Sequence, residues 1–504
     1  MSSTRPNAMI WNRESWDYQV DKMSVPSYHD IMSKQKEMSK VYCNRTLNLR
    51  AIRAVGYDMD YTLVHYHVEE WERRSFHHLK QKLLGRGWLV EGFEFDPEAF
   101  QRGLFIDKQE GNIVKANQFG YVKRASHGMR MFDFDEQRKA YAEVIVDPLD
   151  GRFVFLNTLF SISKASMYAQ LVDLLDTGQL PGIMGYADLY DILSTSTGEA
   201  HMEGQLKSEI ILDPERFVDL DPETPQALLD QHNAGDKLLL ITNSEWTYTN
   251  SVMSYTFDRF LPGAMKWKNL FDVVIVSARK PSFFLSTQPF FEVVSEDGLL
   301  NPVVGTPGTG KILLGGHAAM VEEMLGLKAA QILFVGDHAY DDVHVSKNVR
   351  RWRTALIIRE LEEEVRALEV FRPRQQRLTG LMEEKVNLES RQAQLRLLIQ
   401  RRKEGTPGAE LDRIKKTLLK LDERITPIAR EASELRNKRW GLMMRTGNDK
   451  SYMARMVERH ADIYTSRVSN LVHETPYAFF RAYRGAMPHD DGEQPEMERF
   501  NESQ

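Results

Sequence analysis

The chain has 504 residues and a formal net charge of -6 at pH 7, from 66 Lys and Arg against 72 Asp and Glu. This length exceeds the size of one comfortable hydrophobic core, so we expect at least two structural units. Hydrophobic residues make up 42% and charged residues 27% of the sequence, which is typical of globular proteins and excludes wholesale disorder. The acidic balance leaves no global basic field, so we expect no nucleic acid polymer as a partner.

Cysteine usage and hydropathy indicate the compartment. Cys43 is the single cysteine, so the chain cannot form an internal disulfide, which fits a reducing environment. No apolar run approaches the roughly 20 residues needed to span a bilayer, and the N-terminal residues lack the apolar stretch of a signal peptide. We therefore expect a cytoplasmic protein that does not interact with membranes.

Short apolar runs separated by helical patterns predict the fold class. Alternating strand and helix signals are typical of a doubly wound, Rossmann-like α/β sheet with buried parallel strands. The predicted strands are 52–56, 237–242, 271–277, 331–336 and 354–358, and two of the helical patterns are 225–234 and 317–325.

The first two of these runs are separated by about 180 residues, whereas a plain crossover needs only a dozen or more. The intervening sequence mixes Gly-punctuated short segments with a helical run at 166–175, which predicts an inserted α+β cap. The predicted division is an N-terminal arm at 1–45, a catalytic core at 46–100 and 220–360, a cap at 101–219, a helical hairpin at 361–440, and a C-terminal segment packing on the core at 441–504.

Charged helix formers dominate 361–440 and are interrupted at 405–408, which predicts a helical hairpin with its turn there. The second half carries apolar residues at alternating spacings of four and three, the a/d seam of a coiled coil. These residues are Ile414, Leu418, Leu421, Ile425, Ile428, Ala432 and Leu435. The seam suits packing within the hairpin and an oligomer interface alike, and Pro427 should kink the second helix.

Two carboxylates, Asp58 and Asp60, follow the first predicted strand. In an open α/β sheet ligands bind beyond the carboxyl ends of the strands, so both side chains should lie at the functional edge. One carboxylate at this spacing can attack phosphorus while the other protonates the leaving oxygen. Because a lone Asp-x-Asp is more often a turn, the other strand ends decide between these interpretations.

Three further strand ends carry polar residues that complement this pair. The second supplies a hydroxyl and amides that can cradle phosphoryl oxygens, the third a cation, and the fourth acidic ligands for a hard cation such as Mg²⁺. In chain order these are Thr242 with Asn243 and Ser244, then Lys280, then Asp337 with Asp342.

This order of residues resembles the haloacid dehalogenase superfamily of phosphotransferases. The resemblance implies Asp58 as nucleophile, Asp60 as general acid and base, and Thr242 and Lys280 as clamps on the phosphoryl group. It also implies Mg²⁺ as cofactor, with the ligand set Asp58, Asp60, Asp337 and Asp342. An aspartate at the second position favours a phosphatase, because it can later activate the water that hydrolyses the acyl phosphate.

Longer strings are similar to the cytosolic purine 5′-nucleotidase family that acts on IMP and GMP. They are GYDMDYTLVHY (56–66), FLNTLF (155–160), ITNSEWTYT (241–249), SARKPSFF (277–284), ILFVGDHAYDDV (332–343) and GLMMRTGNDKSYMARMVERHADIYTSR (441–467). The resemblance implies a homo-oligomer, dimer or tetramer, that hydrolyses a purine nucleoside monophosphate through an aspartyl-phosphate. Phosphoryl transfer to another nucleoside is a secondary activity that it also allows.

The resemblance extends to the substrate site. It implies Phe160 as the base-stacking aromatic, His201 as a cap ligand and Lys207 as a phosphate ligand, beside Asn243 and Ser244 at the strand end. The chain departs from the family at three positions that contact the base, where Ser161, Ser194 and Gly198 replace an Asn, an Arg and an Asp. The preferred base therefore stays open.

A second nucleotide site in the family's animal members involves an Asn and an aromatic that match Asn157 and Tyr340. A structural role for Tyr340 in the core is the alternative. The family's long acidic tail is absent, since the residues after Asp490 are only mildly acidic. The resemblance therefore carries over an effector site at Asn157 and Tyr340 only weakly.

The segment 305–311, Gly-Thr-Pro-Gly-Thr-Gly-Lys, satisfies most of a P-loop motif, but Ile312 stands where the motif needs Ser or Thr. We expect a Gly-rich hairpin turn there instead.

The sequence leaves two alternatives to a 5′-nucleotidase: a sugar-phosphate phosphatase with the same chemistry, and a non-catalytic nucleotide sensor or scaffold. The sensor has no need for both Asp58 and Asp60.

Overall fold

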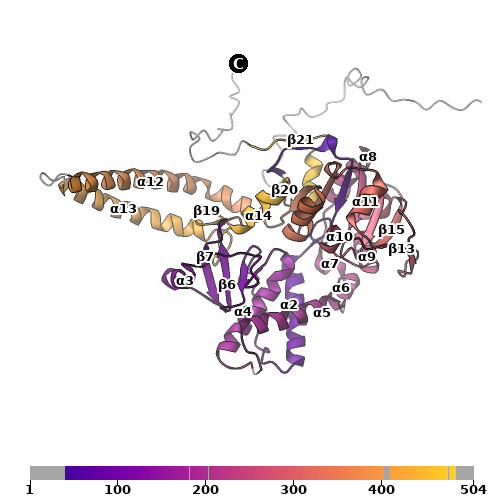
Figure 1. Ribbon diagram of the computed structural model, residues 1–504, viewed down its shortest axis with the longest axis horizontal. Helices are drawn as coiled ribbons and strands as arrows, with labels where there is room; N and C mark the ends of the chain where they lie inside the picture. Colours follow the sequence, from indigo (N-terminus) through magenta and orange to yellow (C-terminus); the bar gives the residue numbers. More distant parts are fainter. Residues whose placement is uncertain (1–39, 181, 203, 402–407, 475, 484–504) are drawn as a thin grey trace, which may run out of the picture.

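The computed structural model describes residues 40–180, 182–202, 204–401, 408–474 and 476–483, without the side chains of 197–202. In Figure 1 the body has an upper and a lower part, each with strands, and a long helical hairpin projects from the body to one side. The predicted arm and the end of the C-terminal segment lie mostly outside the described residues. No described helix is long and apolar enough to cross a bilayer; the expected cytoplasmic location stays a prediction.

A ten-stranded sheet forms the centre of the described chain, in the order β1-β20-β17-β16-β3-β11-β12-β15-β13-β14. Neighbouring strands from β20 to β15 are parallel, and the strands at both edges are antiparallel. The five predicted strands are confirmed as β3 (Ala54–Tyr57), β11 (Lys237–Ile241), β12 (Val273–Val276), β16 (Ile332–Gly336) and β17 (Arg353–Ile357).

Helices cover both faces of this sheet, which confirms the doubly wound α/β fold. Alternate strand residues point to opposite faces. On one face Val55 and Leu238 pack with residues of α8 (Glu223–Asn233) and α9 (Trp246–Phe257). On the other face Ala54 and Leu239 pack with residues of α10 (Ser282–Leu285) and α11 (Ala318–Leu325).

Two parallel strands escaped sequence analysis. β15 (Lys311–Gly315) directly follows the Gly-rich segment 305–310, and β20 (Ile463–Thr465) comes from the C-terminal segment. β15 pairs with β12 and β13, while β14 (Leu300–Pro302) pairs with β13 (Phe290–Val293). The predicted hairpin turn is therefore wrong, because the Gly-rich segment joins strands that are not neighbours. A strand, rather than the helix of a P-loop, follows it.

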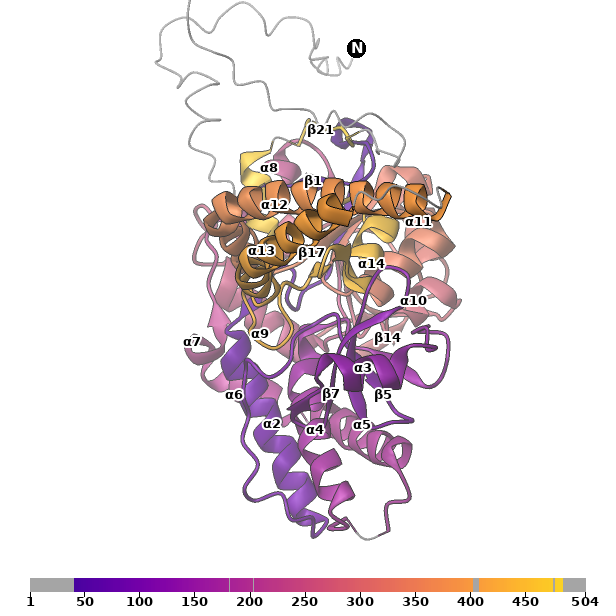
Figure 2. The same cartoon turned by 90° about the vertical axis from the view of Figure 1, so that its left-hand side faces the viewer.

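The inserted cap combines a five-stranded antiparallel sheet, in the order β8-β7-β6-β5-β9, with several helices. Figure 2 shows α2 (Val68–Gly85), α4 (Ile162–Asp176) and α5 (Tyr186–Met202) together in the lower part of the molecule. Buried residues of α2 and α4 share one hydrophobic cluster. This confirms an α+β insert and adds α2 to its packing, while the predicted domain limits stay a prediction.

The remaining elements complete the description of the fold. They are β1 (Tyr42–Cys43), β2 (Leu47–Asn48), β4 (His65–Tyr66), β5 (Phe105–Asp107), β6 (Asn112–Ala116), β7 (Val122–His127), β8 (Arg130–Met131), β9 (Phe153–Phe155), β10 (Val218–Asp219), β18 (Arg445–Thr446), β19 (Asp449–Lys450), β21 (Phe479–Phe480), α3 (Phe134–Tyr141), α6 (Gln205–Leu212), α7 (Pro214–Phe217) and α14 (Tyr452–His460).

The hairpin consists of α12 (Leu361–Arg401) and α13 (Gly408–Ser433), which lie side by side in Figure 1. Residues of the predicted seam are buried between the two helices, with Leu421, Ile425 and Ile428 packing against α12. The helical hairpin is thereby confirmed. Most of its predicted turn lies outside the described residues, and the kink at Pro427 and the oligomer interface stay predictions.

Two buried polar side chains bind the backbone of residues 440–443, which follow the hairpin. Lys115 of the cap sheet is 1% exposed, and its Nζ donates to the carbonyl oxygens of Trp440 and Leu442, each at 2.6 Å. Glu364 of α12 accepts the amide of Met443 at 2.8 Å. The segment is thus held between the cap and the hairpin.

Replacing Lys115 by Met, of similar length, should lower the free energy of unfolding by about 3 kcal/mol, because two buried carbonyls lose their donor. Burial lowers the pKa of Lys115 to about 7. Since the unfolded chain then binds more protons above pH 7, the wild-type stability should rise relative to Lys115→Met as the pH increases from about 7 to about 10. Denaturant unfolding across this pH range measures both effects.

Lys123→Met is the matched control, since Lys123 lies on the neighbouring strand with its side chain 45% exposed and its Nζ 3.4 Å from Asp449. Its effect should stay within about 0.5 kcal/mol. A loss as large as that of Lys115→Met would contradict the role given to the buried Nζ of Lys115 as a hydrogen-bond donor.

Candidate active site

Four adjacent parallel strands, β16, β3, β11 and β12, end at the same edge of the sheet. Asp337 follows β16, Asp58 follows β3, Thr242 follows β11, and Lys280 follows β12 after a short turn. Because parallel strands bring their carboxyl ends together, residues distant in sequence meet here. All four of these side chains are buried.

An acidic cluster lies at the centre of this edge. Carboxylate oxygens of Asp58, Asp337 and Asp342 all lie within 4.8 Å of one another. The ammonium of Lys280 is 2.7 Å from Asp58 Oδ1 and 2.8 Å from Asp342 Oδ1. If all three carboxyl groups were ionised, they would outnumber this ammonium and repel one another.

Burial and mutual repulsion change the protonation of these groups. Burial raises the pKa of Asp58 to about 7, with Asp342 adding to the rise and Lys280 opposing it. Burial also raises the pKa of Asp337 well above its usual range. Although burial alone would lower the pKa of Lys280, Asp342 and Asp58 raise it, so this side chain stays charged.

These carboxylates suit a hard divalent cation. Oδ2 of Asp337 is buried and has no hydrogen-bond partner among the described residues, so it is available as a ligand. Oxygen donors of this kind are those that Mg²⁺ and similar ions prefer, and a cation would offset the repulsion within the cluster.

The carboxylate of Asp60 does not join this cluster. Its Oδ1 accepts the hydroxyl of Tyr66 at 2.5 Å, and its Oδ2 accepts the hydroxyl of Ser244 at 2.7 Å. Lys207 of the cap helix α6 donates to Ser244 Oγ at 3.1 Å and to Glu245 at 2.8 Å. The predicted phosphate ligands Ser244 and Lys207 therefore meet beside the predicted acid.

Asn243 has a different position from its two neighbours. Its side chain accepts the amide of Lys280 at 2.6 Å and donates to the carbonyl of Lys280 at 3.1 Å. Thr242 Oγ1 accepts the amide of Ser244 at 3.0 Å. Asn243 thus fixes the loop that carries Lys280, and its predicted contact with phosphate stays a prediction.

The sequence of the chain matches a known enzyme family. The sequence model of the 5′ nucleotidase family matches residues 41–492, most of the chain. The chain belongs to the 5′ nucleotidase family. It is therefore a phosphoric monoester hydrolase, as the sequence predicts.

A relative supports this assignment at the level of sequence. A 5′-nucleotidase domain-containing protein of Dictyostelium discoideum is 26% identical over 464 residues, which are 89% of this chain and 74% of that protein. Neither comparison identifies a base, so the purine-specific subtype stays a prediction.

Solved structures show more distant similarity to this 5′ nucleotidase family member. The archaeal β-phosphoglucomutase of Pyrococcus sp. strain ST 04 has a TM-score of 0.30 and 9% identity, covering 61% of this chain and 87% of that one. A HAD phosphatase of Thermococcus onnurineus has a TM-score of 0.24 and 14% identity, with coverage of 61% and 87%. Both proteins cover only part of this nucleotidase chain.

The cap contributes an aromatic residue to the neighbourhood of the nucleotidase site. Phe160 lies in the 3-10 helix η4 (Leu159–Ser161) that precedes α4. Its ring contacts those of Tyr61 and Trp71, with centroids 4.8 and 5.3 Å apart. Phe160 therefore lies near the loop after Asp60. The side chain of His201, at the end of α5, lies outside the described residues.

The two residues of the possible effector site come from different elements. Asn157 lies in the loop after β9, and Tyr340 lies in the π-helix η7 (Ala339–His344) after β16. Tyr340 is 42% exposed and stacks on His344 with ring centroids 4.8 Å apart. An effector role for this pair stays a prediction.

Two residues of the site, Arg102 and Tyr66, were not predicted from the sequence. Arg102 is 1% exposed, and its guanidinium donates to the carbonyl of Asp337 at 3.1 Å and to Glu360 at 2.7 Å. Tyr66 is the hydroxyl donor to Asp60. Nothing in the sequence around Arg102 indicated this role, because its burial and its partners depend on other elements of the fold.

Proposed function

We propose that the protein is a Mg²⁺-dependent 5′-nucleotidase that hydrolyses purine nucleoside monophosphates of the IMP and GMP type through an aspartyl-phosphate on Asp58. The observation that carries this proposal is the meeting of Asp58, Asp60, Thr242 and Lys280 at one edge of the sheet. Family membership supports the reaction class. Phe160 near the loop after Asp60 supports an aromatic base as part of the substrate.

The first step transfers the phosphoryl group to the protein. A carboxylate oxygen of Asp58 attacks phosphorus, the bond from phosphorus to the 5′ oxygen breaks, and Asp60 donates a proton to that oxygen. Lys280, 2.7 Å from Asp58, offsets the charge that accumulates on the phosphoryl oxygens. Thr242 and Ser244 would donate their hydroxyls to those oxygens.

The second step releases phosphate. Asp60, now ionised, takes a proton from a water molecule that attacks phosphorus, and the bond from phosphorus to Asp58 breaks. The products are a nucleoside and inorganic phosphate, and the carboxylate of Asp58 is regenerated. A nucleoside hydroxyl in place of water would give the phosphotransferase activity that we also propose.

The acidic cluster would hold the metal. Asp58, Asp337 and Asp342 are the side chains that fit a bound Mg²⁺; the family resemblance adds Asp60, whose carboxylate lies outside this cluster. When bound, Mg²⁺ supplies positive charge that allows a phosphate dianion to approach these carboxylates. A homo-oligomer and an effector site at Asn157 and Tyr340 belong to the same proposal.

Phosphate release from a panel of nucleoside monophosphates and sugar phosphates tests the proposal. Purine monophosphates should be the best substrates, and EDTA should lower the rate at least about 100-fold because the phosphate then meets uncompensated carboxylates. Added Mg²⁺ should restore the rate.

Two outcomes would contradict different parts of this function. Sugar phosphates that outperform every nucleotide would favour the sugar-phosphate phosphatase alternative. An undiminished rate in EDTA would exclude the metal. The sensor alternative predicts nucleotide binding without any phosphate release.

A further inference from the structure

The hydroxyl of Tyr66 has no role in the mechanism above, although it lies against the predicted acid. Tyr66 is 2% exposed and donates to Asp60 Oδ1 at 2.5 Å. A short hydrogen bond from a buried hydroxyl restricts the rotation of the carboxyl group that accepts it. Tyr66 therefore has the contacts expected of a residue that orients Asp60.

Several contacts hold Tyr66 itself in place. It lies on β4, and β4 pairs with β10. At β10 the chain returns from the cap to the core. Its ring lies 4.5 Å from that of Trp71 and 5.3 Å from that of Tyr61, between centroids. Its hydroxyl lies 2.8 Å from the hydroxyl of Tyr248, a fully buried residue of α9. Core and cap thus jointly fix this hydroxyl.

The two oxygens of Asp60 have different surroundings. Oδ1 contacts Tyr66, whose ring packs against the rings of Tyr61 and Trp71. Oδ2 contacts Ser244. Ser244 also accepts Lys207, and both are predicted phosphate ligands. A bound phosphate would compete for Ser244 and Lys207, which would leave Oδ2 free while Tyr66 still holds Oδ1.

We propose that Tyr66 is a positioning residue that orients the Asp60 carboxyl so that Oδ2 transfers its proton to the leaving oxygen. This inference rests on the proposed function, in which Asp60 is the general acid. Tyr66 does not touch the substrate and acts only through Asp60. Its loss should therefore reduce proton transfer and leave the attack of Asp58 on phosphorus intact.

Leaving groups of different basicity separate these two effects. A nucleoside or simple alkyl alcohol is a poor leaving group and needs a proton in the transition state, whereas 2,4-dinitrophenolate leaves without one. Positioning of the acid should therefore matter for alkyl phosphates and hardly matter for 2,4-dinitrophenyl phosphate. The parameter kcat/KM reports the formation of the aspartyl-phosphate, the step in which the leaving group departs.

Tyr66→Phe is the test, with kcat/KM measured at saturating Mg²⁺. We expect a loss of at least about tenfold for nucleoside and alkyl monophosphates, and of less than about threefold for 2,4-dinitrophenyl phosphate. Equal losses for both substrate types, or no loss for either, would overturn the proposal.

Two further variants control for structure. Tyr168→Phe removes the hydroxyl of another buried tyrosine, which donates to the carbonyl of Tyr186 at 3.3 Å in the cap, and should leave the ratio of the two rates unchanged. Tyr248→Phe removes the neighbour of the Tyr66 hydroxyl and should cause a smaller loss with the same dependence on leaving group. If Tyr66→Phe does not fold, the result for Tyr248→Phe decides.

The ratio of the rates with alkyl and aryl phosphates tests Tyr66 whatever the natural substrate is. A wild-type protein that hydrolyses alkyl and aryl phosphates but no nucleotide would refute the nucleotidase proposal, and the alkyl-to-aryl ratio of Tyr66→Phe would still test Tyr66. A nucleotidase whose ratio is unchanged in Tyr66→Phe would refute the role of Tyr66 alone.

Discussion

Asp58→Asn should lower the rate of phosphate release at least about 10⁴-fold with every substrate, since an amide cannot form the aspartyl-phosphate. Asn keeps the shape of the side chain, so the surrounding side chains should keep their positions. The measurement is phosphate release at saturating Mg²⁺ for wild type and variant. No other described carboxylate is both within reach of Lys280 and placed directly after β3.

Thermal unfolding separates loss of chemistry from loss of fold in this variant. Asp58→Asn removes one of several mutually repelling buried carboxylates. Its melting temperature should therefore lie no more than a few degrees below that of wild type. Asp412→Asn, on the exposed surface of the hairpin, is the control and should keep full activity. Activity that survives in Asp58→Asn would exclude Asp58 as the nucleophile.

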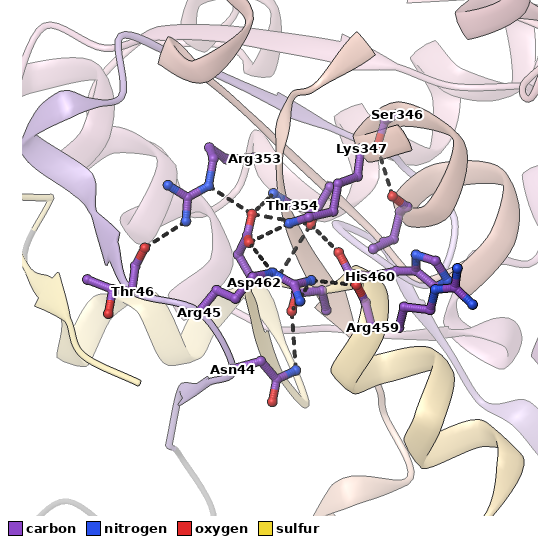
Figure 3. A network of polar contacts seen from close by, with 12 residues as sticks. Asn44, Arg45, Thr46, Ser346, Lys347, Arg353, Thr354, Arg459, His460 and Asp462 are labelled. Atoms are coloured by element: carbon purple, nitrogen blue, oxygen red, sulfur yellow. Dashed lines mark hydrogen bonds and ion pairs between the residues drawn. The ribbon is translucent and has the colours of Figure 1, made fainter. Parts of the chain in front are cut away.

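Asp462→Ala should lower the free energy of unfolding by about 2 to 4 kcal/mol, because three partly exposed cations lose their buried counter-charge and the buried amide of Thr354 loses its acceptor. Figure 3 shows this carboxylate at the centre of a polar network, with Arg45, Lys347 and Arg353 converging on it. Its Oδ2 also accepts the amide of Thr354 at 3.0 Å. Denaturant unfolding at neutral pH measures the loss.

The effect of Asp462 should depend on pH in a defined direction. Burial alone would raise the pKa of Asp462, but Arg353 and Lys347 hold it below its usual value. A carboxyl group with a lowered pKa stabilises the fold above its unfolded pKa of about 3.9, and this contribution disappears as the pH falls further. The stability difference between wild type and variant should therefore shrink below about pH 4.

Asp412→Ala serves as the control for Asp462, since the Asp412 side chain is 71% exposed and lies 3.5 Å from Lys415. Its effect should be under about 0.5 kcal/mol. A comparably small effect of Asp462→Ala would show that the C-terminal segment does not depend on this network for its attachment to the sheet.

The sequence by itself indicated the class of fold, since buried parallel strands leave continuous apolar runs that local patterns reveal. β3, β11, β12, β16 and β17 were all found in this way. β15 and β20 were missed for a physical reason. β15 is only partly buried, and β20 has three residues, so neither has the long apolar run of a central strand.

The candidate site divides in the same manner. Asp58, Thr242, Lys280 and Asp337 could be nominated from the sequence because each follows an apolar run, and parallel strands bring such ends together. Arg102 and Tyr66 could not, because their partners lie on other elements. The sequence places a residue after a strand, whereas the direction of its side chain depends on the packing around it.

Asp60 shows this limit most clearly. Its place two residues after Asp58 was enough to nominate it as the acid. Only the tertiary structure decided that its oxygens face Tyr66 and Ser244 rather than the acidic cluster. Tyr66 lies on β4, which is held by its pairing with the distant strand β10, and Ser244 follows β11, 184 residues away from Asp60 in sequence. What the sequence determined was the set of chemical groups; what folding decided was which of them touch, since contact depends on the meeting of distant segments.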